Sequence, residues 1–165
     1  MTGRMAGAAL GPGALLVAAV VLPLAAVGAA LVSQHVFDQQ PCPWCVLQRV
    51  IFVAIAMAAL PGLLWHQPGA RRASGALVLM LAGGGAAAAL WQHFVAASSV
   101  SCNLTLADRI VGTLGLDTLW PEVFAAYASC ADAAVKLAGV SYEFYSLALF
   151  TALALAAVQV LRRPT

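Results

Sequence analysis

The chain has 165 residues, of which 63% are hydrophobic and only 8% carry a charge. An average soluble domain contains about 25% charged residues, and so few charges could not cover a water-exposed surface. The formal net charge is only +2, from eight basic and six acidic residues, which argues against a nucleic-acid-binding surface. The composition therefore predicts an integral membrane protein.

Four apolar segments follow one another along the chain, and each approaches the ~20 residues that a membrane-spanning helix needs. They cover residues 14–32, 46–64, 73–90 and 145–161. Aromatic residues such as Trp44, Trp65 and Trp91 lie near their ends, as is usual at a membrane interface. The sequence thus predicts an all-α integral membrane protein, a bundle of four transmembrane helices that forms a single membrane domain over residues 1–165.

The first apolar segment follows a short basic start and has a second interpretation. Residues 26–30 read Ala-Val-Gly-Ala-Ala, the kind of small-residue stretch at which signal peptides are cleaved. However, the apolar run of residues 14–32 is longer than the ~7 to 15 residues of a signal-peptide core, which favours a transmembrane helix. Both interpretations place the following segment outside the cytoplasm.

The charged residues are divided unevenly among the connections, and this division predicts the orientation. Five of the eight basic residues lie in the N-terminal tail, the second connection and the C-terminal tail: Arg4, Arg71, Arg72, Arg162 and Arg163. All six acidic residues lie in or beside the first and third connections. Because basic residues concentrate on the cytoplasmic side of a membrane, both termini are predicted to be cytoplasmic, and residues 33–45 and 96–144 to form periplasmic loops.

The two predicted outer loops differ in length and character. The short loop ends in Pro41-Cys42-Pro43-Trp44-Cys45, whose prolines delay the start of the second helix. The long loop mixes apolar and charged residues over 104–127, which predicts short amphipathic pieces on the membrane surface. Within the third apolar segment, the glycines of residues 83–85 indicate close helix packing rather than a ligand site.

All four cysteines lie in these outer loops, and they are the candidate catalytic residues. Cys42 and Cys45 are in the first loop, and Cys102 and Cys130 are in the second. An oxidising compartment preserves disulfides, and four cysteines allow three pairings, among which the sequence does not choose. Cys-x-x-Cys at the start of a helix brings two sulfurs within bonding reach and suits reversible exchange, which favours Cys42 with Cys45 and leaves Cys102 with Cys130.

Two other interpretations of the cysteines stay open. They could form two purely stabilising disulfides, although Cys-x-x-Cys at a membrane boundary is a poor staple for a long loop. They could also form a four-cysteine zinc site, but such sites usually contain two close-spaced pairs, and Cys102 and Cys130 are isolated. Thiol–disulfide redox chemistry is the favoured interpretation.

Arg49 and His93 are the candidate ligand-binding residues beside the cysteines. Arg49 follows Cys45 by four positions and so shares its helix face, where a cation and the helix N-terminus would both stabilise a thiolate. The alternative is an arginine that only reaches the head-group region. His35 and His93 end the first and third segments at the depth of Cys45, where a histidine could donate to a bound carbonyl, carry a proton, or simply be an interfacial polar residue.

These features together resemble the disulfide bond formation protein B (DsbB) family. The resemblance rests on four spans, on Cys42-Pro43-Trp44-Cys45 leading to Arg49, and on the Cys102 and Cys130 pair in the second outer loop. The stretches Gln34-His35-Val36, Trp91-Gln92-His93 and Trp120-Pro121-Glu122-Val123-Phe124 also match. The likeness covers nearly the whole chain, and it implies a quinone-dependent protein-disulfide oxidoreductase of the bacterial inner membrane.

In that family, Cys102/Cys130 would oxidise a periplasmic DsbA-like thioredoxin-fold protein through a mixed disulfide at Cys102. Electrons would then pass to Cys42/Cys45 and on to ubiquinone or menaquinone. The resemblance also implies that Arg49 polarises a quinone oxygen and stabilises the Cys45 thiolate, with His93 as a nearby polar contact. A DsbA-type protein near −120 mV is a strong oxidant, so its regeneration needs a still stronger one, and a quinone is suitable.

The sequence departs from the family pattern in the Pro43-Trp44 dipeptide and at Val140-Ser141-Tyr142, where the fourth span begins without an expected proline or tryptophan.

Two competing functions also remain. A vitamin K epoxide reductase-like protein would share the chemistry, but its loop cysteines would precede the Cys-x-x-Cys. A non-catalytic membrane scaffold would use the same cysteines only as structural disulfides.

Overall fold

The computed structural model describes residues 11–98, 105–133, 136–137 and 139–163. Its main elements are four helices that are long and apolar enough to cross a membrane. They are α1 (Pro12–Val36), α2 (Pro43–Leu64), α3 (Pro68–Phe94) and α7 (Tyr142–Arg162). Each helix contains one of the four apolar segments expected from the sequence, so the described part of the chain has the architecture of an all-α membrane protein.

The starts of these helices are set by local sequence. Pro12, Pro43 and Pro68 each occupy the first helical position, where the missing N–H costs nothing and the fixed φ suits a helix. Between α1 and α2, Asp38 turns the chain with a positive φ of 53°, a conformation that aspartate tolerates better than most residues. Because of this turn, the α1–α2 connection, which leads into the Cys-x-x-Cys, is short.

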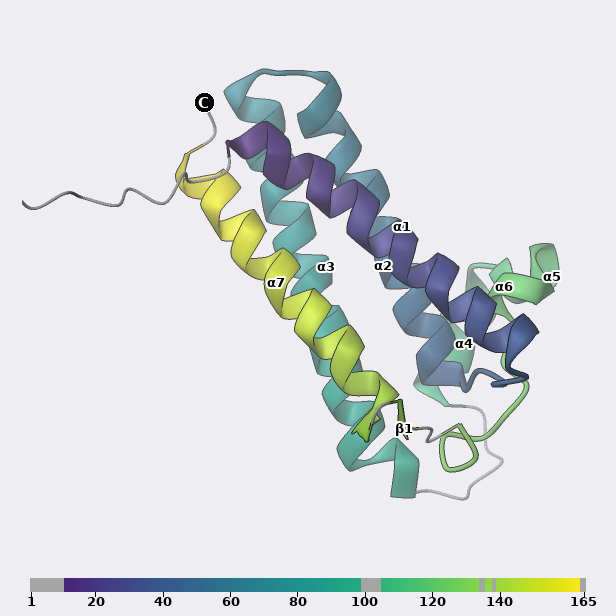
Figure 1. The fold of residues 1–165 in the computed structure, drawn as a ribbon. Helices are drawn as coiled ribbons and strands as arrows, with labels where there is room; N and C mark the ends of the chain where they lie inside the picture. The colour runs from purple at the N-terminus through teal and green to yellow at the C-terminus, as the bar shows by residue number, and fades with distance from the viewer. Residues whose placement is uncertain (1–10, 99–104, 134–135, 138, 164–165) are drawn as a thin grey trace, which may run out of the picture.

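The four long helices form a closed bundle. Helix α2 packs against α1 and α3, and α7 packs against α3 and α1 (Figure 1). Side chains from all four helices meet in its core, including Leu16, Ile55, Val78 and Phe150. The bundle interior is apolar over most of its length, which makes the polar residues at one end stand out.

Close packing at a glycine joins α3 to α7. The ring of Phe150 stacks on that of Phe52, with centroids 4.2 Å apart and planes 10° apart. A Cβ atom on Gly85 would lie only 2.3 Å from the Phe150 ring, whereas one on Gly83 or Gly84 would meet nothing within 4 Å. The packing role expected for the three glycines therefore applies to Gly85.

The connection between α3 and α7 is folded and partly docked on the bundle. It contains η1 (Ala96–Ser98), α4 (Leu106–Thr113), α5 (Leu116–Leu119), α6 (Pro121–Phe124) and the antiparallel strands β1 (Lys136–Leu137) and β2 (Val140–Ser141). Thr105 and Asp108 form a capping box that starts α4. Helices α4 and α6 pack against α2, a contact that the sequence did not predict, and the small β-hairpin was not predicted either.

The two ends of the bundle are formed by different segments of the chain. The start of α1, the end of α7 and the α2–α3 connection lie together at one end (Figure 1). The α1–α2 connection, the short helices α4 to α6 and the β-hairpin lie at the other. Cys42, Cys45 and Cys130 all belong to this second end, whereas Cys102 lies outside the described residues.

Candidate functional site

The start of α2 holds Cys42 and Cys45 side by side. Cys42 is the residue that caps the helix, and its sulfur accepts a hydrogen bond of 3.3 Å from the backbone N–H of Cys45. The two sulfur atoms lie 2.7 Å apart. Both therefore experience the positive end of the helix dipole, which favours a thiolate.

The long connection brings Cys130 to the same place. The backbone N–H groups of Tyr127 and Ala128 donate to the carbonyl of Pro41, at 3.0 and 3.2 Å. Cys130 is buried in a cluster that also contains Cys42 and the apolar residues of α4 and α6. Two cysteines that are 88 positions apart in the sequence are thus neighbours in space.

The contact between Cys42 and Cys130 makes the two thiols unequal. Hydrogen bonding with Cys130 and Cys45, together with burial, raises the pKa of the Cys42 thiol above its ordinary value. Hydrogen bonding with Cys42 lowers the pKa of Cys130, and this effect outweighs the opposing effect of burial. Cys130 is therefore the more readily ionised member of the pair.

Arg49 lies one turn after Cys45 and points into the bundle. Its Nη1 donates to Gln34 Oε1 at 2.7 Å and to the carbonyl of Val123 at 3.0 Å, and its Nη2 donates to the carbonyl of Ala30 at 3.5 Å. All three acceptors are uncharged, and no carboxylate of the described residues pairs with the guanidinium. A buried cation without a counter-ion stabilises nearby negative charge strongly.

Two buried glutamines place a hydrogen-bond donor on the Cys45 sulfur. Gln48 Nε2 donates to Gln92 Oε1 at 2.7 Å, and Gln92 Nε2 donates to Cys45 Sγ at 3.3 Å. Because the oxygen of Gln92 accepts from Gln48, its N–H₂ group faces the sulfur. Helix α3 therefore contributes directly to the surroundings of the Cys45 sulfur.

His93 follows Gln92 but contacts a different partner. Its Nδ1 lies 2.6 Å from Glu143 Oε1, at the first turn of α7. The Glu143 side chain is 6% exposed, whereas that of His93 is 31% exposed. Glu143 lines a cavity between α1, α2 and α7, whereas His93 does not line it and contacts Glu143 from outside.

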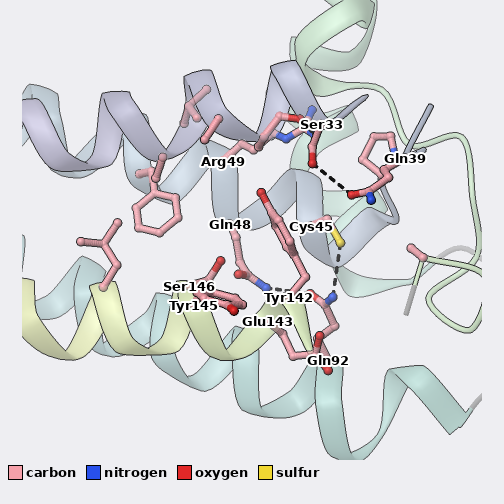
Figure 2. Close-up of a pocket in the computed structure, with 18 of the residues that line it drawn as sticks. Ser33, Gln39, Cys45, Gln48, Arg49, Gln92, Tyr142, Glu143, Tyr145 and Ser146 are labelled. Atoms are coloured by element: carbon pink, nitrogen blue, oxygen red, sulfur yellow. Dashed lines mark hydrogen bonds between the residues drawn. The ribbon is translucent and has the colours of Figure 1, made fainter. Parts of the chain in front are cut away.

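A cavity of about 290 Å³ lies between α1, α2 and α7, with Cys45 and Arg49 in its wall. Figure 2 shows the polar side chains that gather at one side of it: Cys45, Gln48, Arg49, Gln92, Tyr142 and Glu143. Apolar residues line the remainder, including Ala26, Val27, Phe52 and Leu149. A mostly apolar cavity with a few convergent polar groups is the usual form of a small-molecule site.

Comparison with known proteins identifies the family. Residues 12–160 match the family model described as "Disulfide bond formation protein DsbB". The chain belongs to the DsbB family. Membership identifies a membrane protein of disulfide bond formation, and hence a disulfide oxidoreductase. It also decides against the vitamin K epoxide reductase-like alternative.

Three curated relatives illustrate the match. Disulfide bond formation protein B of Aromatoleum aromaticum is 31% identical over 141 residues, which cover 82% of this chain and 84% of that protein. The protein of the same name from Ralstonia nicotianae is 33% identical and covers 90% of this chain and 92% of its own length. Disulfide bond formation protein B 1 of Pseudomonas aeruginosa is 34% identical, with coverages of 92% and 96%. The likeness to DsbB proteins therefore extends over nearly the whole chain.

Of the residues singled out from the sequence, the structure brings Cys42, Cys45, Arg49 and Cys130 to one end of α2. His93 reaches the cavity only through Glu143. Four other residues of the wall were not among the predicted site residues: Gln48, Gln92, Tyr142 and Glu143. Polar residues in membrane helices usually face the bundle interior, and this rule could have drawn attention to the glutamines.

Proposed function

We propose that the protein reoxidises a periplasmic DsbA-like thioredoxin-fold protein and passes the electrons to a membrane quinone. In this proposal, the chain is a single domain of the bacterial inner membrane, with both termini in the cytoplasm and the cysteines on the periplasmic side. One observation carries the proposal: Cys130 lies against Cys42, while Cys45 forms part of the wall of a cavity inside the bundle. The sulfur atoms of Cys130, Cys42 and Cys45 thus form a series from the long connection to the apolar interior of the bundle.

The first exchange takes place in the long loop. A thiolate of the reduced partner attacks Cys102 in the Cys102–Cys130 disulfide, and the Cys130 thiolate leaves. The second thiol of the partner then displaces Cys102, so that the partner is oxidised and the loop pair has gained two electrons. The role of Cys102 rests on the family resemblance.

The second exchange moves these electrons inward. The Cys130 thiolate attacks the sulfur of Cys42 in the Cys42–Cys45 disulfide, and Cys45 leaves as a thiolate. Cys102 then attacks Cys130, which releases Cys42 and restores the loop disulfide. The position of Cys130 against Cys42 supports its role as attacking group, and the Gln92 N–H and Arg49 would stabilise the Cys45 thiolate.

The residues of the cavity fit a quinone. The apolar walls suit its ring, the Arg49 guanidinium suits a carbonyl oxygen, and the Cys45 sulfur lies in the same wall. A bound quinone supplies the final two-electron acceptor for the Cys42/Cys45 dithiol. Meanwhile the protein positions Cys45, keeps water away from it and holds positive charge beside its sulfur.

The decisive experiment is quinone-dependent oxidation of a reduced thioredoxin-fold partner by the purified protein and its four single-cysteine variants. We expect Cys45→Ser to abolish quinone reduction. We expect Cys102→Ala to block turnover of the partner while sparing the Cys42–Cys45 disulfide. If the wild type leaves both quinone and partner unchanged, the proposal fails and the scaffold function is favoured.

A further inference from the structure

Glu143 is an unusual residue for its position. It is the acidic side chain that is buried among the described residues, and it lies in the first turn of a candidate membrane span. Burying a carboxyl group is costly unless it is paired, and ionisable groups inside membrane proteins commonly serve function. Glu143 also belongs to the wall of the cavity that contains Cys45 and Arg49.

His93 connects this buried carboxyl group to the exterior. Its Nδ1 lies 2.6 Å from Glu143 Oε1, and 31% of its side chain is exposed. The ring is held in place by Phe94 and Phe144, whose centroids lie 4.9 and 4.6 Å away. The pair therefore extends from the cavity wall to the end of α3, where the long connection begins.

The proposed reaction needs a proton donor in the cavity. Oxidation of the Cys42/Cys45 dithiol to a disulfide releases two electrons and two protons, and reduction of a quinone to a quinol takes up two of each. Arg49 does not give up its proton, the amides of Gln48 and Gln92 are not acids, and Cys45 has already lost its proton when it acts as a thiolate. The phenols of Tyr142 and Tyr145, which also line the cavity, are far weaker acids than a carboxyl group. Glu143 is the carboxyl group of the wall and has a partner that is partly exposed near the end of α3.

We propose that Glu143 and His93 form a proton relay that delivers protons from the outer aqueous side into the cavity. The inference rests on the proposed function. Glu143 gives its carboxyl proton to a quinone oxygen, His93 restores that proton through Nδ1, and His93 then takes one from water. The thiol protons leave to the outer solution, so the overall proton count balances.

The surroundings of Glu143 and His93 favour this proton transfer. Carboxylate with imidazolium and carboxylic acid with neutral imidazole have the same net charge, so moving the proton between them places no extra charge in the apolar interior. The other titratable or charged groups that share the cavity wall are Cys45 and Arg49 of α2 and Tyr142 and Tyr145 of α7.

The first test uses Glu143→Gln, which retains the size and the hydrogen-bonding capacity of the side chain but cannot deliver a proton. The pre-reduced variant is mixed with a short-chain quinone, and a single turnover is followed by absorbance. We expect the rate to fall by ~100-fold or more, as for loss of a general acid, with little change in quinone affinity. Thiol–disulfide exchange with the partner should keep its normal rate. Glu122→Gln, which changes an exposed carboxyl group, is the matched control and should behave as wild type.

A second readout needs no quinone. Nitrogen-15 NMR of the quinone-free protein, labelled at histidine, reports the contact of the His93 ring with Glu143. Glu143→Gln should shift the resonance of His93 Nδ1, and Glu122→Gln should leave it in place. A resonance that is insensitive to Glu143→Gln would overturn the relay.

The outcomes separate the relay from the proposed function. If the wild type does not reduce quinone, the proposed function fails and the relay fails with it. If the wild type is active and folded Glu143→Gln matches it, only the relay fails. Should Glu143→Gln not fold, His93→Gln tests the same step at a partly exposed residue: a slowed single turnover supports the relay, and a normal one overturns it. Glu143→Asp, which retains a carboxyl group, should recover part of the rate.

Discussion

At the scale of single residues, the contact between Cys42 and Cys130 makes the two thiols of the reduced protein unequal in acidity. The pKa of the fully buried Cys42 is raised, so this residue stays a thiol, whereas the pKa of Cys130 is lowered and it ionises more easily.

This difference predicts the pH dependence of alkylation in the reduced protein. Only the thiolate reacts, so each rate rises with pH through the pKa of that cysteine and then levels off. Because the pKa of Cys130 is lowered and that of Cys42 is raised, Cys130 should reach its plateau at lower pH. Mass spectrometry of iodoacetamide-treated protein measures both rates. Cys42→Ala removes the hydrogen-bonding partner and should move the Cys130 profile to higher pH, and an unmoved profile would contradict the assigned cause.

Arg49 is the second residue whose environment defines its role. Its three hydrogen-bond acceptors are neutral, so its charge remains available to a group in the cavity. Hydrogen bonds to charged groups contribute ~1.5–3 kcal/mol, so Arg49→Gln should raise the KM for quinone by ~10-fold or more. Steady-state quinone titrations measure this change. Arg109→Gln, at an exposed position of α4, is the control and should leave the KM unchanged. Equal KM values for Arg49→Gln and Arg109→Gln would mean that Arg49 acts only in packing.

At the scale of elements, the contact between α3 and α7 depends on the missing side chain of Gly85. A methyl group there would overlap the Phe150 ring, which is fully buried and stacked on Phe52. Overpacking of this kind costs ~1–3 kcal/mol, so Gly85→Ala should lower the thermal denaturation midpoint in detergent. Gly83→Ala meets no neighbouring atom and should leave the midpoint equal or higher. If Gly85→Ala and Gly83→Ala lower the denaturation midpoint equally, the contact with Phe150 is not the cause of the destabilisation.

Helices α1 and α7 also form two walls of the cavity. Ala29 is exposed on the surface of α1 and lines the cavity, so it lies at a side opening. Ala29→Trp should block this opening and raise the KM for a long-chain quinone at least several-fold, with little effect on partner exchange. Ala25→Trp adds the same bulk about one turn away, at an exposed position that does not line the cavity. An equal KM in both tryptophan variants would exclude entry between α1 and α7.

The sequence predicted the elements better than it predicted the site. The four helices follow from apolar runs of sufficient length, and the place of Cys45 and Arg49 on one face follows from helical spacing. The contact of Cys130 with Cys42 depends on how α4 and α6 dock on α2, and no local pattern encodes such a docking. The pairing of His93 with Glu143 likewise joins the end of one helix to the start of another, so neither residue alone indicates it.

At the scale of the whole molecule, the two ends of the bundle should face different compartments. We expect a cysteine introduced by His66→Cys, in the α2–α3 connection, to face the cytoplasm, and one introduced by Thr113→Cys, at the end of α4, to face the periplasm. In a variant whose native cysteines are all serine, a membrane-impermeant maleimide should label intact cells only at position 113. Labelling at position 66 should require permeabilised cells. The opposite result would reverse the orientation and remove the periplasmic partner from the proposal.

The attachment of the long connection at Pro41 has an evolutionary consequence. Main-chain atoms of Tyr127 and Ala128 make this attachment, so its hydrogen bonds do not depend on which side chains occupy those positions. In the proposed function, the exposed surface of the connection could therefore diverge together with a changing partner protein, while Cys130 stays against Cys42. Recognition of the partner and internal electron transfer would then be open to separate selection.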